Sequence, residues 1–575
     1  MEKQWQLLNP NPQTVRKLTR QMGCSPLTAR LLVIRGIQSE SQASRFLRPS
    51  LNHLTPPMEM AGMQAAVDRI QRALMTDETI MVCGDYDADG ITATALLVAF
   101  LRQCGATVDY YIPHRIIDGY GLQADVISKR VLPAGVKLIV TADCGTGSQD
   151  AITSAYQAGI DTIVTDHHPV DRLPERAVSV INPARSDCKA NLNHLAGVGV
   201  AFYLIIALRT QLRQSGFWNQ RKEPNLKQLC DLVALGTIAD VSPLIEENRD
   251  LTVAGLQQIN QYPRPGLLAL MHMSGLSGAP VDAETIAFKL APRLNAAGRL
   301  VHARMACELL LTTHNQKARR LAGALCRLNH RRQLMETELL QSIQERLAAV
   351  PDELRRPVLF VHGNGWHEGI LGIVASRLTR QYHRPAVVIS SRNGMAKGSA
   401  RSIEGIDMAK ALTTCADQLD SFGGHPLAAG LSLSARRIDA FRSRLEAAVE
   451  GLTAEHGAKP PTVSIDAQLP LGHVNPALME RLERLGPFGQ HNPHPLFMDT
   501  GLRIIDSKTV GGRHRRMILA TGTGGNANHP AIQFNVGNRP LAKKRFEKIA
   551  YRPQWNYWKG RKQLQLLIED TDPDS

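Results

Sequence analysis

The chain has 575 residues, 43% hydrophobic and 21% charged, which is the composition of a globular protein too long for a single core. Its net charge of +15 indicates an anionic partner, first nucleic acid and second an acidic membrane surface, unless the protein is basic without such a partner. Nine cysteines without a Cys-x-x-Cys pair argue against a disulfide framework and a cysteine zinc site. The lack of a signal-like start and of a long apolar run predicts a cytoplasmic protein with no membrane span.

The first half of the chain predicts an α/β domain. Residues 1–58 are mostly polar and predict a small lead-in region, and the domain itself is expected over 59–312. Short apolar segments alternate there with helical ones, which favours a parallel sheet with helices on both faces. The expected strands are 79–83, 107–112, 136–141, 161–165 and 178–181. In such sheets, ligands collect at the carboxyl ends of the strands.

Acidic and histidine side chains stand just past the ends of these apolar elements. They are Asp85, Asp87, Asp89, Asp143, Asp166, His167, His168 and Asp240. Three carboxylates within one turn of chain repel one another and need a positive partner, most simply a divalent metal ion. Carboxylates mixed with imidazoles suit Mn²⁺ or a similar ion better than Ca²⁺ or structural zinc. Each aspartate alone could instead cap the N-terminus of a helix.

The second half predicts a connector and another α/β unit. An amphipathic pattern over 313–350 predicts a connecting helix about 50 Å long, with a helical hairpin inside one domain as the alternative. The second unit is expected over 351–455. Residues 395–402 predict a loop in which Ser399 and Arg401 cradle a phosphate, because glycine allows close approach and arginine forks onto phosphate oxygens. Residues 423–425 add flexible backbone beside an imidazole donor.

The last part, 456–575, predicts a β-barrel of the OB type, because short strands alternate with glycine-rich turns. Residues 501–575 hold 14 Lys and Arg against 6 Asp and Glu, so they contribute +8 to the net charge. Trp555 and Trp558 lie among these cations. Aromatic rings interleaved with cations suit single-stranded nucleic acid, whose bases stack and whose phosphates are neutralised. The alternative is that the rings fill the barrel core.

The acidic and histidine motifs resemble, in order and context, the four motifs of the DHH phosphoesterase family. Segments 292–299, 365–377, 398–402 and 423–430 also resemble its RecJ branch of bacterial single-strand-specific exonucleases. The resemblance is colinear from about residue 60 to at least 500. It implies a DHH domain, a DHHA1-like domain and an OB-like domain. It further implies a metal-dependent enzyme that degrades single-stranded DNA 5′→3′ to mononucleotides in DNA repair and recombination.

The resemblance also implies roles for individual residues. Asp87, Asp143, His167 and Asp240 would hold one ion, and Asp85 a second, with Asp143 bridging. Met81 stands where relatives carry a further histidine ligand, which leaves one or two ions open. The catalytic candidates are Asp143, His168, which could orient or protonate the phosphate, and Asp89, which could instead cap the following helix. The substrate-binding candidates are Arg115, Arg293, Asn295, Ser399, Arg401, Gly424, His425, Trp555 and Trp558.

We therefore expect an exonuclease that uses Mn²⁺ or Mg²⁺, acts on single-stranded DNA, is a monomer, and works with a helicase and a single-strand-binding protein. One alternative is a DHH phosphodiesterase for short oligonucleotides or cyclic dinucleotides, which would not need a basic barrel. Another is a catalytically inactive DNA-binding scaffold, which would not need the complete set of ligands. A pyrophosphatase would not explain the +8 segment.

Overall fold

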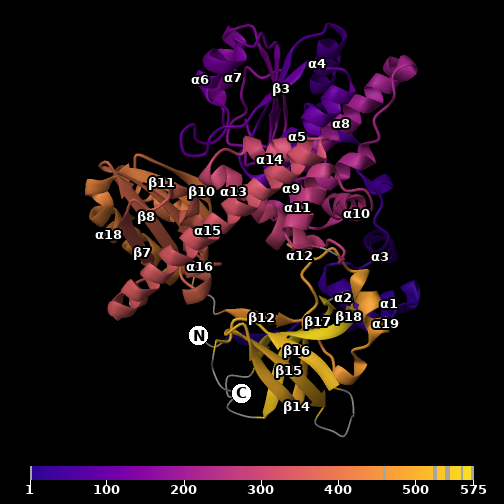
Figure 1. The fold of residues 1–575 in the computed structure, drawn as a ribbon, viewed down its shortest axis with the longest axis vertical. Coiled ribbons are helices and arrows are strands. Elements are labelled where there is room, and N and C mark those ends of the chain that lie inside the picture. The colour runs from indigo at the N-terminus through magenta and orange to yellow at the C-terminus, as the bar shows by residue number, and fades with distance from the viewer. Residues whose placement is uncertain are drawn as a thin grey trace.

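The computed structural model describes residues 3–276, 278–456, 461–521, 528–537, 544–558 and 561–571, with backbone only for 455, 456 and 558. Figure 1 shows three parts: an α/β domain in indigo to magenta, a smaller α/β domain in orange, and a yellow barrel. Among the described helices, none is both long and apolar enough to cross a bilayer. The expected architecture of two α/β domains and a C-terminal barrel is confirmed.

The first domain is built on a parallel sheet with strand order β3-β2-β4-β5-β6. Strands β2 and β4 are buried at every position, because helices cover both faces of the sheet. The strands are β2 (Ile80–Gly84), β3 (Val108–Tyr111), β4 (Leu138–Ala142), β5 (Asp161–Thr165) and β6 (Ser179–Ile181). The helices that position the site are α5 (Ala88–Gln103), α8 (Gly197–Gln214), α9 (Cys230–Ala239), α10 (Glu246–Gln261) and α13 (Ala291–Leu300). The others are α4 (Met63–Met75), α6 (Ala124–Val126), α7 (Gln149–Gln157), α11 (Pro265–Met273), α12 (Ala283–Thr285) and α14 (Arg304–Leu311).

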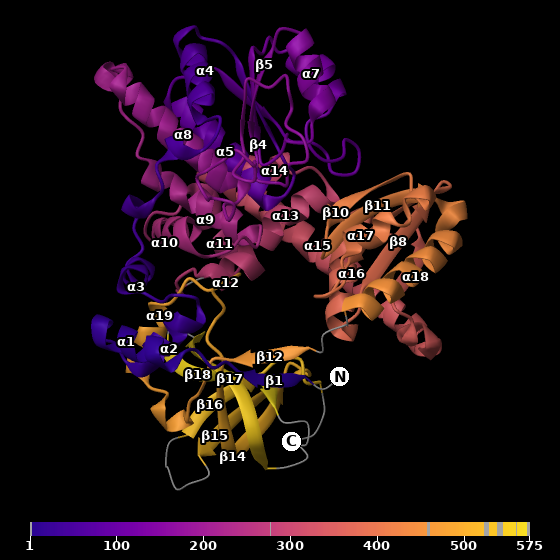
Figure 2. The ribbon, with the colours of Figure 1, turned by 180° about the vertical axis from the view of Figure 1, so that it is seen from behind.

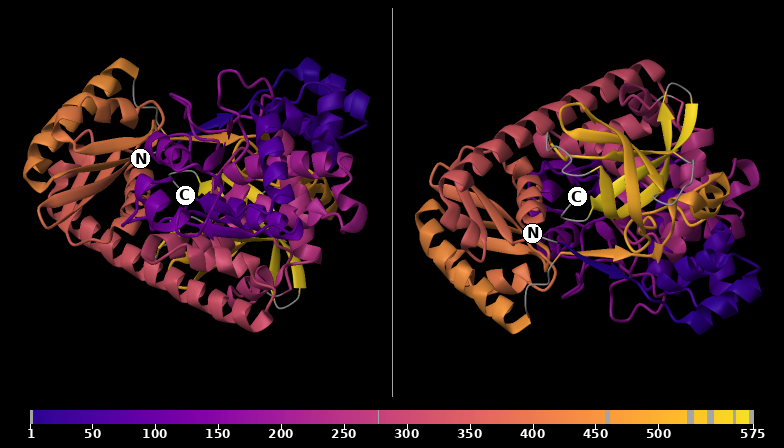
Figure 3. Two further views of the ribbon diagram at one scale, coloured as in Figure 1. Left: turned by 90° about the horizontal axis from the view of Figure 1, so that it is seen from above. Right: turned by 90° about the horizontal axis from the view of Figure 1, so that it is seen from below.

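One continuous helix, α15 (Asn315–Ala349), connects the two α/β domains. Its 35 residues correspond to about 52 Å of helix, so the connector is a single rod and not a helical hairpin. Its first half packs on α11 and α13, and its second half on α16 of the second domain. In Figure 3 the helix runs along one side of the molecule from one domain to the other.

The second domain has a mixed sheet with order β10-β11-β9-β8-β7, in which only β7 and β8 are parallel. Its strands are β7 (Leu359–Asn364), β8 (Ala386–Arg392), β9 (Met395–Arg401), β10 (Ser421–His425) and β11 (Ala428–Ser434). Its helices are α16 (Glu368–Tyr382), α17 (Met408–Thr413) and α18 (Ile438–His456).

The segment 395–402 was expected to be a loop, which was wrong, and the segment 423–425, expected to add flexible backbone, also lies in a strand. Residues 395–401 form β9, which pairs with β8 on one side and β11 on the other. Residues 421–425 form the edge strand β10. Small residues suit both places, because a Cβ on Gly398 would come within 2.9 Å of Ile389 and Leu431 side-chain atoms.

The C-terminal part is a six-stranded sheet with order β13-β14-β15-β16-β18-β17, which the pairing of β14 with β17 closes into a barrel. Its strands are β13 (Ala467–Gln468), β14 (Phe497–Val510), β15 (His514–Thr521), β16 (Asn528–Gln533), β17 (Arg545–Trp558) and β18 (Arg561–Thr571). Helix α19 (Pro476–Glu483) lies between β13 and β14 along the chain.

The N-terminal region, predicted as a lead-in over 1–58, packs on this barrel. Its helices are α1 (Pro12–Met22), α2 (Pro26–Ile34) and α3 (Glu40–Leu47). Leu18, Leu31 and Leu32 join Phe497 and Phe546 in one buried cluster. Strand β1 (Gln4–Leu7) pairs in parallel with β12 (Thr462–Ile465), and the two lie side by side in Figure 2.

Candidate active site

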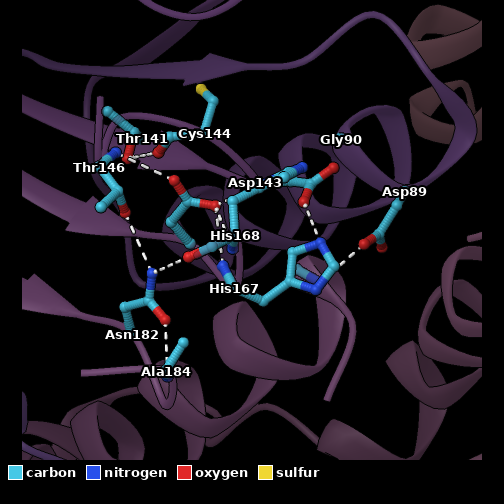
Figure 4. Close-up of polar contacts among 12 residues, drawn as sticks. Asp89, Gly90, Thr141, Asp143, Cys144, Thr146, His167, His168, Asn182 and Ala184 are labelled. Carbon is cyan, nitrogen blue, oxygen red and sulfur yellow. Dashed lines mark hydrogen bonds and ion pairs between the residues drawn. The ribbon is translucent and has the colours of Figure 1, made fainter. Parts of the chain in front are cut away.

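The side chains predicted to bind metal lie together at the carboxyl edge of the parallel sheet. They come from the loops after β2, β4 and β5 and from the C-terminus of α9, and they form three overlapping groups whose ligand atoms lie within 4.8 Å of one another. The members are Asp85, Asp87, Asp89, Asp143, His167, His168 and Asp240. The expectation that ligands collect at the carboxyl ends of parallel strands therefore predicted where this cluster lies. Figure 4 shows the loops that carry Asp143, His167 and His168 meeting at one place.

Three buried polar atoms in this cluster have no hydrogen-bond partner among the described residues. They are Oδ1 of Asp85, Oδ1 of Asp143 and Nε2 of His167. Nε2 of His167 lies 3.1 Å from Oδ1 of Asp143. Asp85 is 3% exposed and Asp143 is 2% exposed. Unpaired buried polar atoms are costly, and such atoms usually have a partner. A divalent cation between them would supply that partner, so the residues fit a metal ion.

Burial and mutual repulsion shift the proton affinities of the cluster. Burial raises the pKa of Asp85 well above its usual value, and the nearby Asp87 carboxylate raises it further. Burial likewise raises the pKa of Asp143, with repulsion from Asp89 as the next cause. Burial lowers the pKa of His167, which favours the neutral imidazole that binds metals. Asp85 and Asp143 therefore tend to hold protons, which a bound cation would displace.

Asp89 has a structural role that its place in the chain does not reveal. Its side chain is 1% exposed and accepts hydrogen bonds from the backbone N–H groups of Gly197 at 2.6 Å and Val198 at 3.0 Å. It thus caps the N-terminus of α8, which lies far away in sequence. The following helix, α5, is instead capped by Asp87, whose Oδ1 accepts from the N–H groups of Asp89 and Gly90.

His168 is held by a carboxylate that lies outside the metal groups. Its Nδ1 is 2.7 Å from Oδ1 of Asp166, and Asp166 Oδ2 accepts from the N–H of Thr146 at 2.9 Å. Burial lowers the pKa of His168, but the hydrogen bond to Asp166 and the charges of the nearby carboxylates together raise it to about 9. His168 therefore carries a proton at neutral pH. The hydroxyl of Tyr120 lies 3.1 Å from the same ring, and no motif in the sequence singled out Tyr120.

Three arginines from two domains converge beside the acidic cluster. The Arg115 guanidinium stacks on the ring of Tyr86, 4.9 Å from its centroid. Burial lowers the pKa of Arg299 to about 10, with repulsion from Arg115 as the next cause. Burial and Arg115 also lower the pKa of Arg401, whose Nη1 donates to Oγ of Ser399 at 3.2 Å. Arg299 was not among the predicted site residues, although the segment 292–299 contains it.

Two further candidates on α13 have structural partners. The side-chain oxygen of Asn295 accepts from the N–H of Ala88 at 2.8 Å and so holds the aspartate loop in place. The Arg293 guanidinium donates to the carbonyl of Lys289, while its buried Nε has no hydrogen-bond partner among the described residues. Their contact with substrate stays a prediction.

The remaining candidates lie in the second domain and in the barrel (Figure 1). Gly424 and His425 are exposed on the edge strand β10. Gly424 has a φ of 146°, and an added Cβ would lie 2.3 Å from the carbonyl oxygen of Ala428. In the barrel, the Lys562 ammonium lies 4.2 Å from the ring centroid of the partly buried Trp555. The side chain of Trp558 lies outside the described part of the chain.

Family comparisons agree with the domain order. The DHH family N-terminal domain matches residues 79–237, the DHHA1 domain 356–451 and the RecJ OB domain 465–570. The single-stranded-DNA-specific exonuclease RecJ of Dickeya dadantii is 39% identical over 563 residues, which cover 95% of this chain and 96% of that protein. The chain belongs to the RecJ family. The RecJ of Escherichia coli is 38% identical and covers the same shares of the two chains.

Solved RecJ structures share the whole architecture. RecJ from Thermus thermophilus in complex with Mn²⁺ superposes with a TM-score of 0.82 at 30% identity, over 99% of this chain and 79% of that one. The Mg²⁺ complex gives a TM-score of 0.77 at 29% identity, with 100% and 79% covered. In this RecJ-family chain, Met81 is buried in β2 and supplies no hard ligand.

Proposed function

We propose that this RecJ-family protein is a metal-dependent exonuclease that hydrolyses phosphodiester bonds of single-stranded DNA. The observation that carries the proposal is the group of unpaired ligand atoms on Asp85, Asp143 and His167, next to the arginines that converge from two domains. Acidic side chains bind the cations that phosphodiester hydrolysis uses, and arginines bind the phosphates of the substrate. The relatives of this family are single-stranded-DNA-specific exonucleases.

The ligand roles follow the family resemblance. Asp87, Asp143, His167 and Asp240 would hold one ion, and Asp85 with Asp143 a second one. The geometry supports part of this assignment, because ligand atoms of Asp85, Asp87 and Asp143 lie within 4.8 Å of one another, as do those of Asp89, His167 and Asp240. Mn²⁺ or Mg²⁺ in these positions would activate a water molecule and neutralise the scissile phosphate. Neutral His167 and the carboxylates serve as ligands once their protons have left.

His168 acts on the substrate and not as a ligand. The hydrogen bond to Asp166 keeps its imidazole protonated at neutral pH and fixes the ring. The second ring nitrogen can then donate a hydrogen bond to the phosphate that is cut, or pass its proton to the leaving oxygen.

The direction of degradation would follow from the arginines. A terminal 5′-phosphate carries more negative charge than an internal phosphate, so Arg115, Arg299 and Arg401, with Ser399, would bind it preferentially. This placement gives 5′→3′ polarity and release of mononucleotides. A role in DNA repair and recombination in the cytoplasm, as a monomer that works with a helicase and a single-strand-binding protein, extends the same proposal.

The test uses 5′-labelled single strands and blunt duplexes, with EDTA, Mg²⁺ and Mn²⁺ compared. We expect cleavage of single strands only, and only with metal. Asp143→Ala should abolish cleavage while the chain still binds DNA, whereas Asp150→Ala, which removes an exposed carboxylate on α7, should behave as the wild type. Cleavage that survives EDTA, or equal degradation of blunt duplex, would contradict the proposed function.

A further inference from the structure

Asp240 differs from the other ligands in its setting. The others follow strands of one sheet, whereas Asp240 is the C-cap of helix α9. The C-terminus of a helix carries partial negative charge, which repels a carboxylate. The next residue, Val241, has a φ of 62°, which a β-branched residue rarely adopts. A strained segment of this kind persists only where its surroundings hold it in place.

Contacts within the first domain hold both ends of this segment. The Ser242 hydroxyl donates to Oδ2 of Asp240 at 2.6 Å, and the Ser242 N–H donates to the carbonyl of Thr237 at 3.2 Å. At the far end, the Asn248 side chain donates to the carbonyl of Pro243 at 3.0 Å, and Leu244 is part of the domain's buried core. The C-terminal part of the chain adds a further contact there. The N–H of Leu244, which is 2% exposed, donates to the carbonyl of Gln490 at 2.8 Å.

Gln490 lies in a rigid turn, residues 485–492, between α19 and β14. The buried Asn492 side chain closes it by donating to the carbonyls of Leu485 and Pro487, each at 2.8 Å. Across the turn, the N–H of Gly489 donates to the carbonyl of Asn492 at 2.9 Å. The turn therefore keeps its shape through its own hydrogen bonds.

The turn is also fixed against the first domain. Buried Arg249 on α10 donates to the carbonyl of Leu485 at 3.0 Å. Gly489 packs directly on Leu244, because an added Cβ would lie 2.7 Å from its Cδ1 atom. The backbone of the turn thus contacts the segment that begins at Asp240 at two positions, Gly489 and Gln490.

We propose that the turn 485–492 is a positioning element of the metal centre. It adds to the first-domain contacts that fix the far end of the segment 241–244, and it thereby helps to hold the carboxylate of Asp240 in place. The inference rests on the proposed function, since it takes Asp240 as a metal ligand. The C-terminal part would then contribute to metal affinity as well as to DNA binding, although none of its own side chains reaches the metal groups among the described residues.

The test adds one methyl group to the turn. Gly489→Ala should displace Leu244 and weaken Mn²⁺ binding to the full chain by roughly 10-fold, as loss of an outer-shell partner does. Isothermal titration with Mn²⁺ in the absence of DNA measures this. Gly472→Ala is the matched control, because its added Cβ meets nothing within 4 Å. Single-strand affinity in EDTA should stay unchanged in both variants.

A rescue and a wild-type measurement complete the test. Leu244→Val removes the closest clashing atom, so it should restore part of the Mn²⁺ affinity lost in Gly489→Ala. In the wild-type chain, Mn²⁺ should slow hydrogen exchange at the amides of Gly489 and Asn492, because coupling between two sites is reciprocal. Wild-type Mn²⁺ affinity in Gly489→Ala would overturn the inference and leave the nuclease proposal intact. If that variant does not fold, unchanged exchange in the turn on Mn²⁺ binding would overturn it instead.

Discussion

Replacing Asp89 separates its role as a helix cap from any role at the metal. Its carboxylate accepts two buried hydrogen bonds, from Gly197 at 2.6 Å and Val198 at 3.0 Å. A hydrogen bond to a charged group contributes roughly 1.5–3 kcal/mol, so Asp89→Ala forfeits roughly 3–6 kcal/mol in total. Burial, and next the repulsion from Asp240, raise the pKa of Asp89, so removing its carboxylate relieves an unfavourable interaction that offsets part of this loss. We expect the free energy of unfolding to fall by about 2–4 kcal/mol in EDTA.

Asp89→Asn is the matched comparison, because its one carbonyl oxygen can keep one of the two bonds. It should lose about half as much stability as Asp89→Ala. Thermal unfolding in EDTA should show the difference, since 1 kcal/mol corresponds to about 2–4 °C for a domain of 150–250 residues. Equal stability of the alanine, asparagine and wild-type chains would refute the capping role of Asp89.

Three other predictions follow from the charges and rings described above. In EDTA, the free energy of unfolding should fall as pH rises from about 4, because the folded chain retains protons on Asp85 and Asp143 that the unfolded chain has released. Urea midpoints at pH 5 and 8 measure this loss of stability. Mn²⁺ should remove most of the difference between the two midpoints. Trp555→Ala should weaken single-strand binding by about 1–3 kcal/mol, measured by fluorescence anisotropy, with little change in the cleavage rate at saturating DNA. An equal loss of binding affinity and of cleavage rate would contradict a stacking role. Arg69→Leu should lower the free energy of unfolding by about 1.5–3 kcal/mol, because it removes charged hydrogen bonds to the partly exposed carboxylates of Glu78 and Asp161, each 2.5 Å away, while Arg72 still pairs with Asp161; unchanged urea denaturation would refute this.

The sequence could predict the parallel sheet and its acidic edge, because both have local signatures. Apolar runs such as 138–142 mark strands buried on two faces, and the carboxyl ends of parallel strands share one edge. The sequence alone therefore predicts that Asp85, Asp143 and His167 lie together. Family resemblance supplied the order of the domains and their functions.

Other features depend on contacts between distant residues and leave no local pattern. Strands β9 and β10 are rich in Gly, Ala and Ser, which have little β-propensity, so only pairing with β8 and β11 reveals them. The cap that Asp89 provides for α8 joins residues 108 positions apart. Tyr120 reaches His168 from a loop with no periodic signal. In each case the neighbour, and not the local sequence, decides the role.

The pairing of β1 with β12 affects how this protein is made. Gln4 leaves the ribosome early, but its partner Thr462 is added more than 450 residues later. At 5–20 residues per second, that interval is roughly 25–90 s. Throughout it, the apolar faces of the first helices, including Leu18 and Leu31, lack the barrel core that buries them. These N-terminal helices therefore reach their final place only after the barrel has been made.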